Sequence, residues 1–353
     1  MMRVLVLAVV SAVAAVTTIS AQEAPRSLGG FPVCEASAAA LVPCPESDGT
    51  CLLVGDNEIR NELFVYQLDG DRVITESRKP VRFDHLLPGE PDDQEISDIE
   101  ALVGLPDGEV LIYGSHSRNS ACETRGKRRR YLHASLDNGE LVEGSRPLVS
   151  SKKHSCKRLL GDKRDDLDGT MRQVCDVLER AEEAADEVED LPEDEQASAC
   201  SAAAPFNLEG AVAVPDDDGA RVWVGLRAPL VDGKAVLLRQ KRKRKEFEFN
   251  AAALLDLDGF GVRDMTFADG FVWGIGGPSV DADDAHVLWR VEAGSLQDGA
   301  ELTPELLGSL PRYAEAIVIH DGWLIALMDG AEPEDGSEIC KEDSTYIAMP
   351  VPG

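Results

Sequence analysis

The most regular pattern in the chain is a pair of apolar runs joined by an acidic turn. Residues 208–214 read Leu-Glu-Gly-Ala-Val-Ala-Val, and residues 221–226 form a second apolar run. Between them, residues 216–219 read Asp-Asp-Asp-Gly. An Asp-Gly step between two such runs is a strong sequence signal for a β-hairpin. Glu209 is an acid inside the first run, so it stands apart from its apolar neighbours.

The same unit recurs along the chain. An acid opens an apolar run, an Asp-Gly turn follows and a second run returns, in units marked by Glu100, Glu209, Asp264 and Glu315. The steps between these acids are 109, 55 and 51 residues. The first step approaches the others once an insertion of about 50 residues is removed. Periods of about 40–55 residues with several strands each are typical of β-propellers. We therefore predict an all-β fold, a propeller of five or six blades.

The first unit is less regular than the others. Asp56 or Glu58 stands 44 or 42 residues before Glu100. Either acid follows an apolar run, whereas the acids of the later units open one. We take one of these two acids as the marker of the first unit.

Residues 151–203 interrupt the repeat. Apolar residues recur there at steps of 3 and 4 from Met171 to Val188, which indicates an amphipathic helix. Between Asp176 and Glu195 there are 11 acidic residues and one arginine. We predict an acidic, Cys-containing helical insertion that covers one rim of the domain. A calcium-binding acidic patch is the alternative, although the alternating Asp and Gly of a calcium loop are missing.

The N-terminus has the pattern of a secretory signal peptide. Arg3 precedes the apolar run 4–16, and residues 17–21 are mostly small. We predict a signal peptide over residues 1–21 and a single propeller domain over residues 22–353, secreted or periplasmic. A membrane anchor is the alternative, but a span needs about 20 apolar residues. We expect no membrane span after cleavage.

Charge narrows the choice of partners. The chain has 65 acidic and 35 basic residues and a formal net charge of −30. Nucleic acids are bound through clustered cations, so we expect no nucleic-acid partner. Two short basic segments, 126–130 and 239–245, stand out in this acidic chain. We interpret them as solvent-facing, with binding of an acidic partner as the alternative.

Eight cysteines suit an oxidising compartment. No CxxC pair is present and the six histidines are scattered, so we predict disulfides and not a zinc site. Our hypothesis for the pairing is that one of Cys34, Cys44 or Cys51 joins Cys340. The remaining group would then pair among itself: Cys122, Cys156, Cys175 and Cys200.

In a propeller the first strand of each blade lines the central channel, so acids at one repeated position point toward a common axis. Carboxylates at close range raise one another's pKa unless cations compensate. Hard divalent cations prefer oxygen ligands. We therefore predict a site for calcium or another divalent cation, with ligands Glu100, Glu209, Asp264 and Glu315. Two alternatives stay open: neighbouring arginines neutralise these acids, or each acid caps backbone groups where a strand bends.

Several of these motifs resemble a bacterial secreted family, domain of unknown function 3616, over roughly residues 50–330. The matching stretches are Asp98-Ile99-Glu100-Ala101-Leu102, the GSHSRN loop at 114–119, Asn207-Leu208-Glu209-Gly210, the GLRAP loop at 225–229 and Gly261-Val262-Arg263-Asp264. That family looks related to the esterase-like phytase propellers. The resemblance implies a propeller and an extracytoplasmic location, but no defined reaction. The cysteine-rich insertion departs from the family.

Two functions of different classes fit these observations. The first is a metal-dependent hydrolase of a phosphoester, ester or lactone, in which a cation at the channel acids, Glu100 and Glu209 among them, activates water or polarises the substrate. His116 would be the general base; a structural histidine in a loop is its alternative. The residues that would hold a small anionic substrate are Arg118, Asn119, Arg227 and Arg263.

The second function is a non-catalytic propeller that binds a ligand or protein outside the cytoplasm, because propellers host both roles. The chain has neither a Gly-x-Ser-x-Gly elbow nor a GxxxxGK[ST] loop, which disfavours a serine hydrolase and a nucleotidase. We expect a monomer in either case.

Overall fold

A computed structural model describes residues 24–29, 33–45, 47–89, 94–143, 149–150, 169–217, 219–241, 247–280, 286–330 and 343–352. The predicted signal peptide, residues 1–21, lies outside these ranges. No helix within them is long and apolar enough to cross a bilayer.

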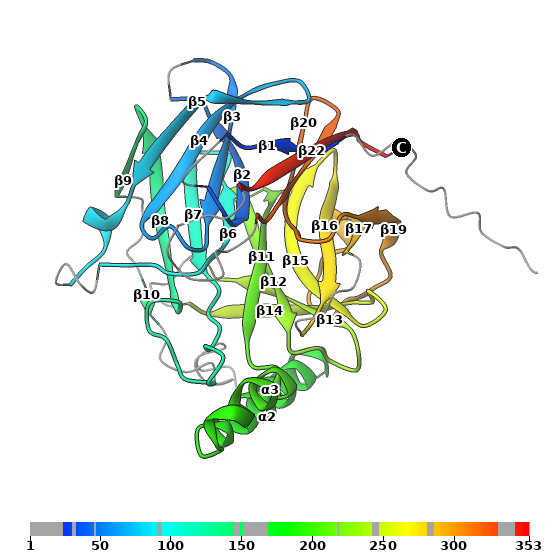
Figure 1. The fold of residues 1–353 in the computed structure, drawn as a ribbon. Coiled ribbons are helices and arrows are strands. Elements are labelled where there is room, and N and C mark those ends of the chain that lie inside the picture. The colour runs from blue at the N-terminus through cyan, green and yellow to red at the C-terminus, as the bar shows by residue number, and fades with distance from the viewer. Residues whose placement is uncertain are drawn as a thin grey trace, which may run out of the picture.

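Five antiparallel sheets stand around a common axis (Figure 1). Blade 1 contains β2 (Ala36–Pro43), β3 (Thr50–Asp56), β4 (Glu62–Asp69) and β5 (Arg72–Arg82), followed by a short 3-10 turn (Asp84–Leu86). Blade 2 contains β6 (Ile99–Gly104), β7 (Glu109–Gly114), β8 (Arg130–Asp137), β9 (Glu140–Glu143) and β10 (Val149–Ser150). Blade 3 contains β11 (Asn207–Asp216), β12 (Gly219–Ala228), β13 (Ala235–Gln240) and β14 (Phe249–Leu255), with β18 (Glu301–Leu302) added in parallel to β14.

Blade 4 contains β15 (Phe260–Ala268), β16 (Phe271–Pro278), β17 (His286–Glu292) and β19 (Glu305–Leu310), with a 3-10 turn at Ala293–Ser295. Blade 5 contains β20 (Ala314–His320), β21 (Trp323–Met328), β22 (Thr345–Pro350) and β1 (Arg26–Ser27). The strand nearest the N-terminus thus completes the last blade, which fastens the two ends of the chain to each other. The described residues form five blades, which confirms the predicted propeller and decides between the two predicted blade numbers.

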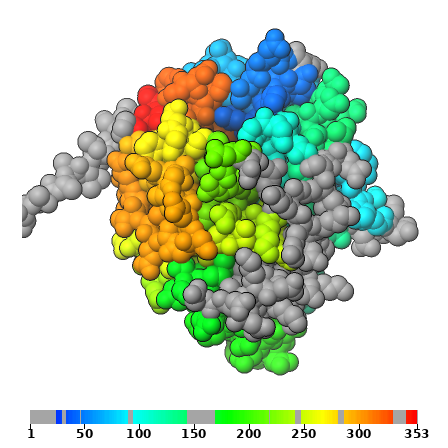
Figure 2. All heavy atoms as spheres, turned by 180° about the vertical axis from the view of Figure 1, so that it is seen from behind, coloured from blue at the N-terminus to red at the C-terminus, as the bar shows by residue number. Residues whose placement is uncertain are grey.

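The innermost strands β2, β6, β11, β15 and β20 form a closed ring, because each contacts the next and β20 contacts β2. Each neighbouring pair of blades encloses one cluster of buried apolar side chains. Figure 2 shows the blue first blade directly beside the orange last blade, and the cluster between them includes Leu52 and Ile325. Burial of apolar surface between the faces of the sheets stabilises the ring.

The predicted helical insertion is confirmed as α2 (Gly169–Val188) and α3 (Glu193–Ala203). Figure 1 shows both helices at one end of the propeller, below β11, β12 and β14. The apolar face of α2 packs into the cluster between blades 2 and 3 through Val174, Cys175 and Leu178. Its acidic residues lie mainly on the other face, as the periodicity predicts.

Disulfides are present as predicted. Cys44 pairs with Cys51, and Cys122 pairs with Cys200. Cys34 and Cys175 are also in disulfides. Since Cys44 and Cys51 bond to each other, only Cys34 of the predicted trio remains as a partner for Cys340. Cys156 and Cys340 themselves lie outside the described residues.

Candidate functional site

Apart from a second irregularity in β11 between Asn207 and Leu208, each innermost strand carries one irregularity, at the same place. Its pairing with the second strand of the blade shifts by one residue, and the residues skipped by these shifts are Ser37, Glu100, Glu209, Arg263 and Glu315. A β-bulge leaves one residue out of the ladder and re-aims its side chain. These five residues are therefore the equivalent positions of the five blades.

Two sequence-based assignments were wrong in register. In blade 4 the equivalent residue is Arg263, and Asp264 is the residue after it. The place after the bulge holds a small residue in the other four blades: Ala38, Ala101, Gly210 and Ala316. In blade 1 the equivalent residue is Ser37, so neither Asp56 nor Glu58 belongs to the repeat.

Asp264 and Asp56 are backbone-binding residues instead. Asp264 is fully buried, and its Oδ2 accepts a hydrogen bond from Ile317 N–H at 2.7 Å, which links blade 4 to blade 5. Burial raises the pKa of Asp264 well above its usual range. Asp56 accepts backbone N–H groups from four residues of two loops: Cys34, Glu35, Glu58 and Ile59. This is the alternative in which an acid caps backbone groups.

Arg263 joins two of the channel acids. Its Nη1 lies 3.0 Å from Glu209 Oε2 and 3.1 Å from Glu315 Oε2. Glu209 also accepts hydrogen bonds from Arg227 Nη1 at 3.1 Å and from Asn207 Nδ2 at 2.9 Å. Burial works against the charged form of Arg263, but Glu209 and Glu315 outweigh it, so its pKa is raised. This is the arrangement in which arginines neutralise channel acids.

The pKa of the Glu315 carboxyl is raised even though Arg263 pairs with it. Burial and the charge of Glu209 raise its pKa to about 7, against the lowering effect of Arg263 and Arg227. The group therefore changes charge near neutral pH.

The largest electrostatic influences on Glu100 come from other carboxyls, although Arg263 also interacts with it. Burial raises its pKa well above the usual range, and four other carboxyls add to the shift: Asp98, Glu209, Glu315 and Asp329. Asp329 is raised in the same way, by burial and then by Glu315. Such surroundings favour the neutral form of a carboxyl, which can donate a proton.

A cavity of about 330 Å³ opens beside Glu100 and Glu209 at the end of the channel that the insertion covers. We call it the channel cavity. One wall comes from α3 and the segment after it, through Ala197, Cys200, Ser201 and Ala204. The charged side chains on the other walls include Asp98, Arg128 and Arg227. Its volume lies within the usual range for small-molecule sites.

Asp98 and Arg128 were not predicted as site residues. Arg128 Nη1 lies 3.1 Å from Asp98 Oδ2 and donates to Ser117 Oγ at 3.0 Å. Ser115 and Ser117 both donate their hydroxyls to Asp98 Oδ2. Both charged residues had a sequence signal: Asp98 stands two residues before Glu100, and Arg128 lies in the basic segment 126–130.

His116 does not line the channel cavity. Its side chain is fully buried, and its ring stacks on Phe247 with centroids 4.4 Å apart. Burial, with Arg129 nearby, lowers the pKa of His116 to about 3. The imidazole is thus neutral and enclosed between blades 2 and 3, which matches its structural alternative and not the predicted general base.

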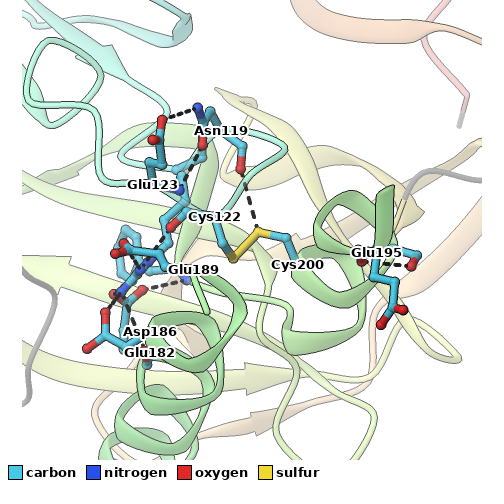
Figure 3. The surroundings of a disulfide bond; sticks show 12 residues. Asn119, Cys122, Glu123, Glu182, Asp186, Glu189, Glu195 and Cys200 are labelled. Atoms are coloured by element: carbon cyan, nitrogen blue, oxygen red, sulfur yellow. Dashed lines mark hydrogen bonds and ion pairs between the residues drawn. A yellow bond between two sulfur atoms is a disulfide. The ribbon is translucent and has the colours of Figure 1, made fainter. Parts of the chain in front are cut away.

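Arg118 and Asn119 line the channel cavity, as predicted for substrate-binding residues, but both also make structural contacts. Figure 3 shows Asn119 with Glu123 and the Cys122–Cys200 disulfide. Arg118 Nη2 lies 2.9 Å from Glu182 Oε2 and 2.6 Å from Asp186 Oδ1, both on α2, and only 1% of its side chain is exposed. The Asn119 amide bonds to the side chain and the backbone of Glu123. The Cys122–Cys200 disulfide ties the same loop to α3. These contacts fasten the insertion over the cavity.

The predicted metal ligands are only partly brought together. Glu209 and Glu315 share Arg263, and Asp264 binds the backbone of blade 5. Within the described ranges, no group of three or more His, Cys, Asp or Glu side chains has the arrangement of a metal site. Glu100 is the predicted ligand that neither an arginine nor a backbone N–H group binds among the contacts of the described residues.

A family model described as "Protein of unknown function (DUF3616)" matches residues 44–308. The chain belongs to the DUF3616 family. The match to this DUF3616 protein runs from the loop before β3 into β19, and it contains Glu100, Glu209 and Arg263. It confirms the resemblance that the motifs carry. No curated protein sequence matches the DUF3616 protein.

Solved structures resemble the DUF3616 protein only distantly. An exo-β-1,3-galactanase from Clostridium thermocellum has 12% identity and a TM-score of 0.47, and the match covers 89% of this chain and 59% of the galactanase. A GH43 β-1,3-galactosidase has 11% identity and a TM-score of 0.44, with 92% and 95% covered. The aldose sugar dehydrogenase of Streptomyces coelicolor has 14% identity and a TM-score of 0.38, with 93% and 99% covered. Likenesses this distant carry no inference about activity.

Proposed function

We propose that this chain is an extracytoplasmic hydrolase that cleaves an ester, phosphoester or lactone bond of a small anionic substrate in the channel cavity. The observation that carries the proposal is Glu100, which lines the cavity and whose surroundings favour its neutral form. A neutral carboxyl at pH 7 is a proton donor for a leaving-group oxygen. The disulfides support the extracytoplasmic location.

Other cavity residues have roles that follow from their contacts. Asp98 is a hydrogen-bond acceptor for two serine hydroxyls and Arg128, so it is suited to orient the attacking water. Arg128 and Arg227 line the same cavity, and guanidinium groups match the geometry of carboxylate and phosphate. Glu209 is a positioning residue, because it holds Arg227 in place.

Calcium or another divalent cation is the alternative to the proton on Glu100, because a cation bound there would replace the proton-donor role. Four acidic neighbours that disfavour a charged Glu100 would favour a cation in place of its proton. Glu100 would hold it, since Glu209 and Glu315 share Arg263 and Asp98 is paired with Arg128. Such a cation would polarise a substrate oxygen. Addition of CaCl₂ should then raise the Tm of the wild type and leave the Tm of Glu100→Gln unchanged.

A panel of p-nitrophenyl phosphate, p-nitrophenyl acetate and simple lactones tests the catalytic proposal. The wild type should turn over at least one substrate. Glu100→Gln should lower kcat by about 10²–10⁴-fold, the usual contribution of a general acid. The matched control is Glu292→Gln, at an exposed glutamate that lines neither the cavity nor the channel, and it should keep full activity. Full activity of Glu100→Gln would overturn the proposed role.

Binding without turnover is the second candidate function. The observation that favours it is the lack of an imidazole among the described residues that line the cavity, together with the double ion pairing of Glu209. A wild type that binds panel compounds in calorimetry but hydrolyses none of them would decide for this candidate.

A further inference from the structure

A second cavity of about 590 Å³ adjoins the channel cavity. The two share Asp98, Asn119 and Arg128. Its walls come from the loop after β3, from the segment that leads into β6 and from the loop between β7 and β8. It therefore lies where blades 1 and 2 meet, next to the proposed proton donor.

The charge of this second cavity differs from that of the chain as a whole. Four of its twelve lining residues are cationic and three are acidic: Arg60, Arg125, Lys127 and Arg128 against Glu58, Glu95 and Asp98. The whole chain has 65 acidic and 35 basic residues. We call this space the basic cavity. The general field of an acidic protein repels anions, so a local excess of cations marks where an anion can bind.

One buried carboxylate serves two of these cations. Glu95 is 9% exposed, and its carboxylate lies 3.2 Å from Arg60 Nη1 and 2.5 Å from Lys127 Nζ. The side chains of Arg60 and Lys127 remain 65% and 39% exposed. Glu95 alone does not neutralise both cations, whereas the other two cations have acids of their own: Arg125 pairs with Glu123 at 2.6 Å and Arg128 with Asp98 at 3.1 Å.

The walls are held by backbone and amide hydrogen bonds. Ser97 N–H donates to Lys127 O at 3.3 Å, which joins two of the walls. Asn61 accepts from Ile96 N–H and donates to Gln94 O, which joins the third. The cations therefore project from a connected frame, and a preorganised frame lowers the cost of binding.

We propose that the basic cavity binds a carboxylate, sulfate or phosphate group at the far end of an elongated substrate whose reacting end occupies the channel cavity. The inference rests on the proposed function only for the position of the reacting end. The volumes of about 330 and 590 Å³ suit a ligand of several units, with the anionic group beyond the first. Lys127 of the basic segment 126–130, which does not line the channel cavity, thereby acquires a role.

The test is calorimetric binding to the full-length mature protein, with and without substitutions. The probes are trigalacturonic acid, inorganic tripolyphosphate, neutral maltotriose and monomeric galacturonic acid. The test variant is Arg60→Gln/Arg125→Gln/Lys127→Gln. The matched control is Arg72→Gln/Arg172→Gln/Arg312→Gln, which removes the same charge at exposed arginines that line neither cavity. Circular dichroism checks that both variants fold.

At least one anionic trimer should bind about tenfold or more tightly than maltotriose and galacturonic acid. The test variant should lose about tenfold or more of that affinity, and the control less than twofold. The trimer that binds separates carboxylate from phosphate recognition. Equal affinity for all four probes, or equal losses in both variants, would overturn the inference. Calorimetric binding needs no turnover, so failure of catalysis is distinguishable from failure of binding.

Discussion

Removal of Arg263 tests how the channel acids are compensated. Its guanidinium lies between Glu209 and Glu315, and the three side chains are 11%, 4% and 12% exposed. Loss of one partner of a buried ion pair costs about 3–5 kcal/mol. We expect Arg263→Gln to lower the free energy of unfolding at pH 8 by about 3 kcal/mol, the lower end, because Glu209 keeps Arg227 and Glu315 can take up a proton.

The destabilisation caused by Arg263→Gln should depend on pH, because Glu315 changes charge near neutral pH. With a pKa of about 7 in the folded chain, Glu315 is mostly neutral at pH 5 and mostly ionised at pH 8. At one pH unit above its pKa, a carboxyl gains about 1.4 kcal/mol of free energy by losing its proton. Without Arg263 the pKa of Glu315 rises further, and that free energy is lost at pH 8 but not at pH 5. The destabilisation should therefore be about 1.4 kcal/mol larger at pH 8.

Urea unfolding followed by tryptophan fluorescence measures both quantities by linear extrapolation. Trp223, Trp273 and Trp289 are buried in blades 3 and 4, so their emission reports on the ring. The matched control is Arg221→Gln, which breaks the exposed ion pair with Asp216 at 2.6 Å and should change stability little. An equal effect of the two substitutions, or an Arg263→Gln effect that is the same at both pH values, would refute the reasoning.

Three further outcomes follow from other contacts. Because the pKa of Glu315 is raised to about 7 in the folded chain, its contribution to stability is complete below its ordinary pKa of 4.5 and is lost as pH rises through about 7. The loss amounts to about 3 kcal/mol. Urea unfolding from pH 4 to 8 should therefore show that the stability of Glu315→Gln depends less on pH than that of the wild type. The Cys122–Cys200 disulfide closes a loop with a sequence separation of 78, and the Cys44–Cys51 disulfide closes one of 7. Chain entropy predicts that replacing both cysteines by Ser lowers the free energy of unfolding by about 4.5 kcal/mol for the first pair and by about 2.4 kcal/mol for the second. Equal losses in calorimetry would contradict this prediction. His116→Ala should lower Tm through lost packing on Phe247 and leave kcat on any panel substrate unchanged, whereas lost turnover with an unchanged Tm would restore His116 as the base.

The propeller was predictable because its signals are local and repeated. Asp-Gly turns stand at 107–108, 269–270 and 321–322. Each of them connects the innermost strand of a blade to the second strand of that blade. The amphipathic period of 171–188 likewise predicted α2. Such signals depend on neighbouring residues, so they survive without knowledge of the tertiary structure.

The register of blade 4 was assigned wrongly from the sequence, because Asp264 was taken for the equivalent of Glu100, Glu209 and Glu315. Asp264 has the acidic character of the repeat, but Met265 follows it, whereas a small residue follows Glu100, Glu209 and Glu315. That difference was a usable signal. The bulge itself has no sequence signature, because it depends on how two strands pair.

Contacts between residues far apart in the sequence determine the surroundings of the remaining predicted site residues. His116 stacks on Phe247, 131 residues later in the chain, and Arg118 pairs with Glu182 and Asp186. The GSHSRN loop therefore fastens the insertion, while Ser117, Arg118 and Asn119 also line the channel cavity, where the polar sequence predicted substrate contact. The cavity wall formed by α3 depends on the Cys122–Cys200 disulfide, and a pairing cannot be read from spacing.

The protonation state of Glu100 is the most direct test of the account. Infrared difference spectroscopy between the wild type and Glu100→Gln at pH 7 isolates this one carboxyl. A protonated C=O stretch that disappears in the variant is the result that we predict, because burial and four acidic neighbours favour the neutral form. A carboxylate band that titrates near the ordinary pKa of 4.5 would contradict both the convergence of acids on the channel and the proposed proton donor.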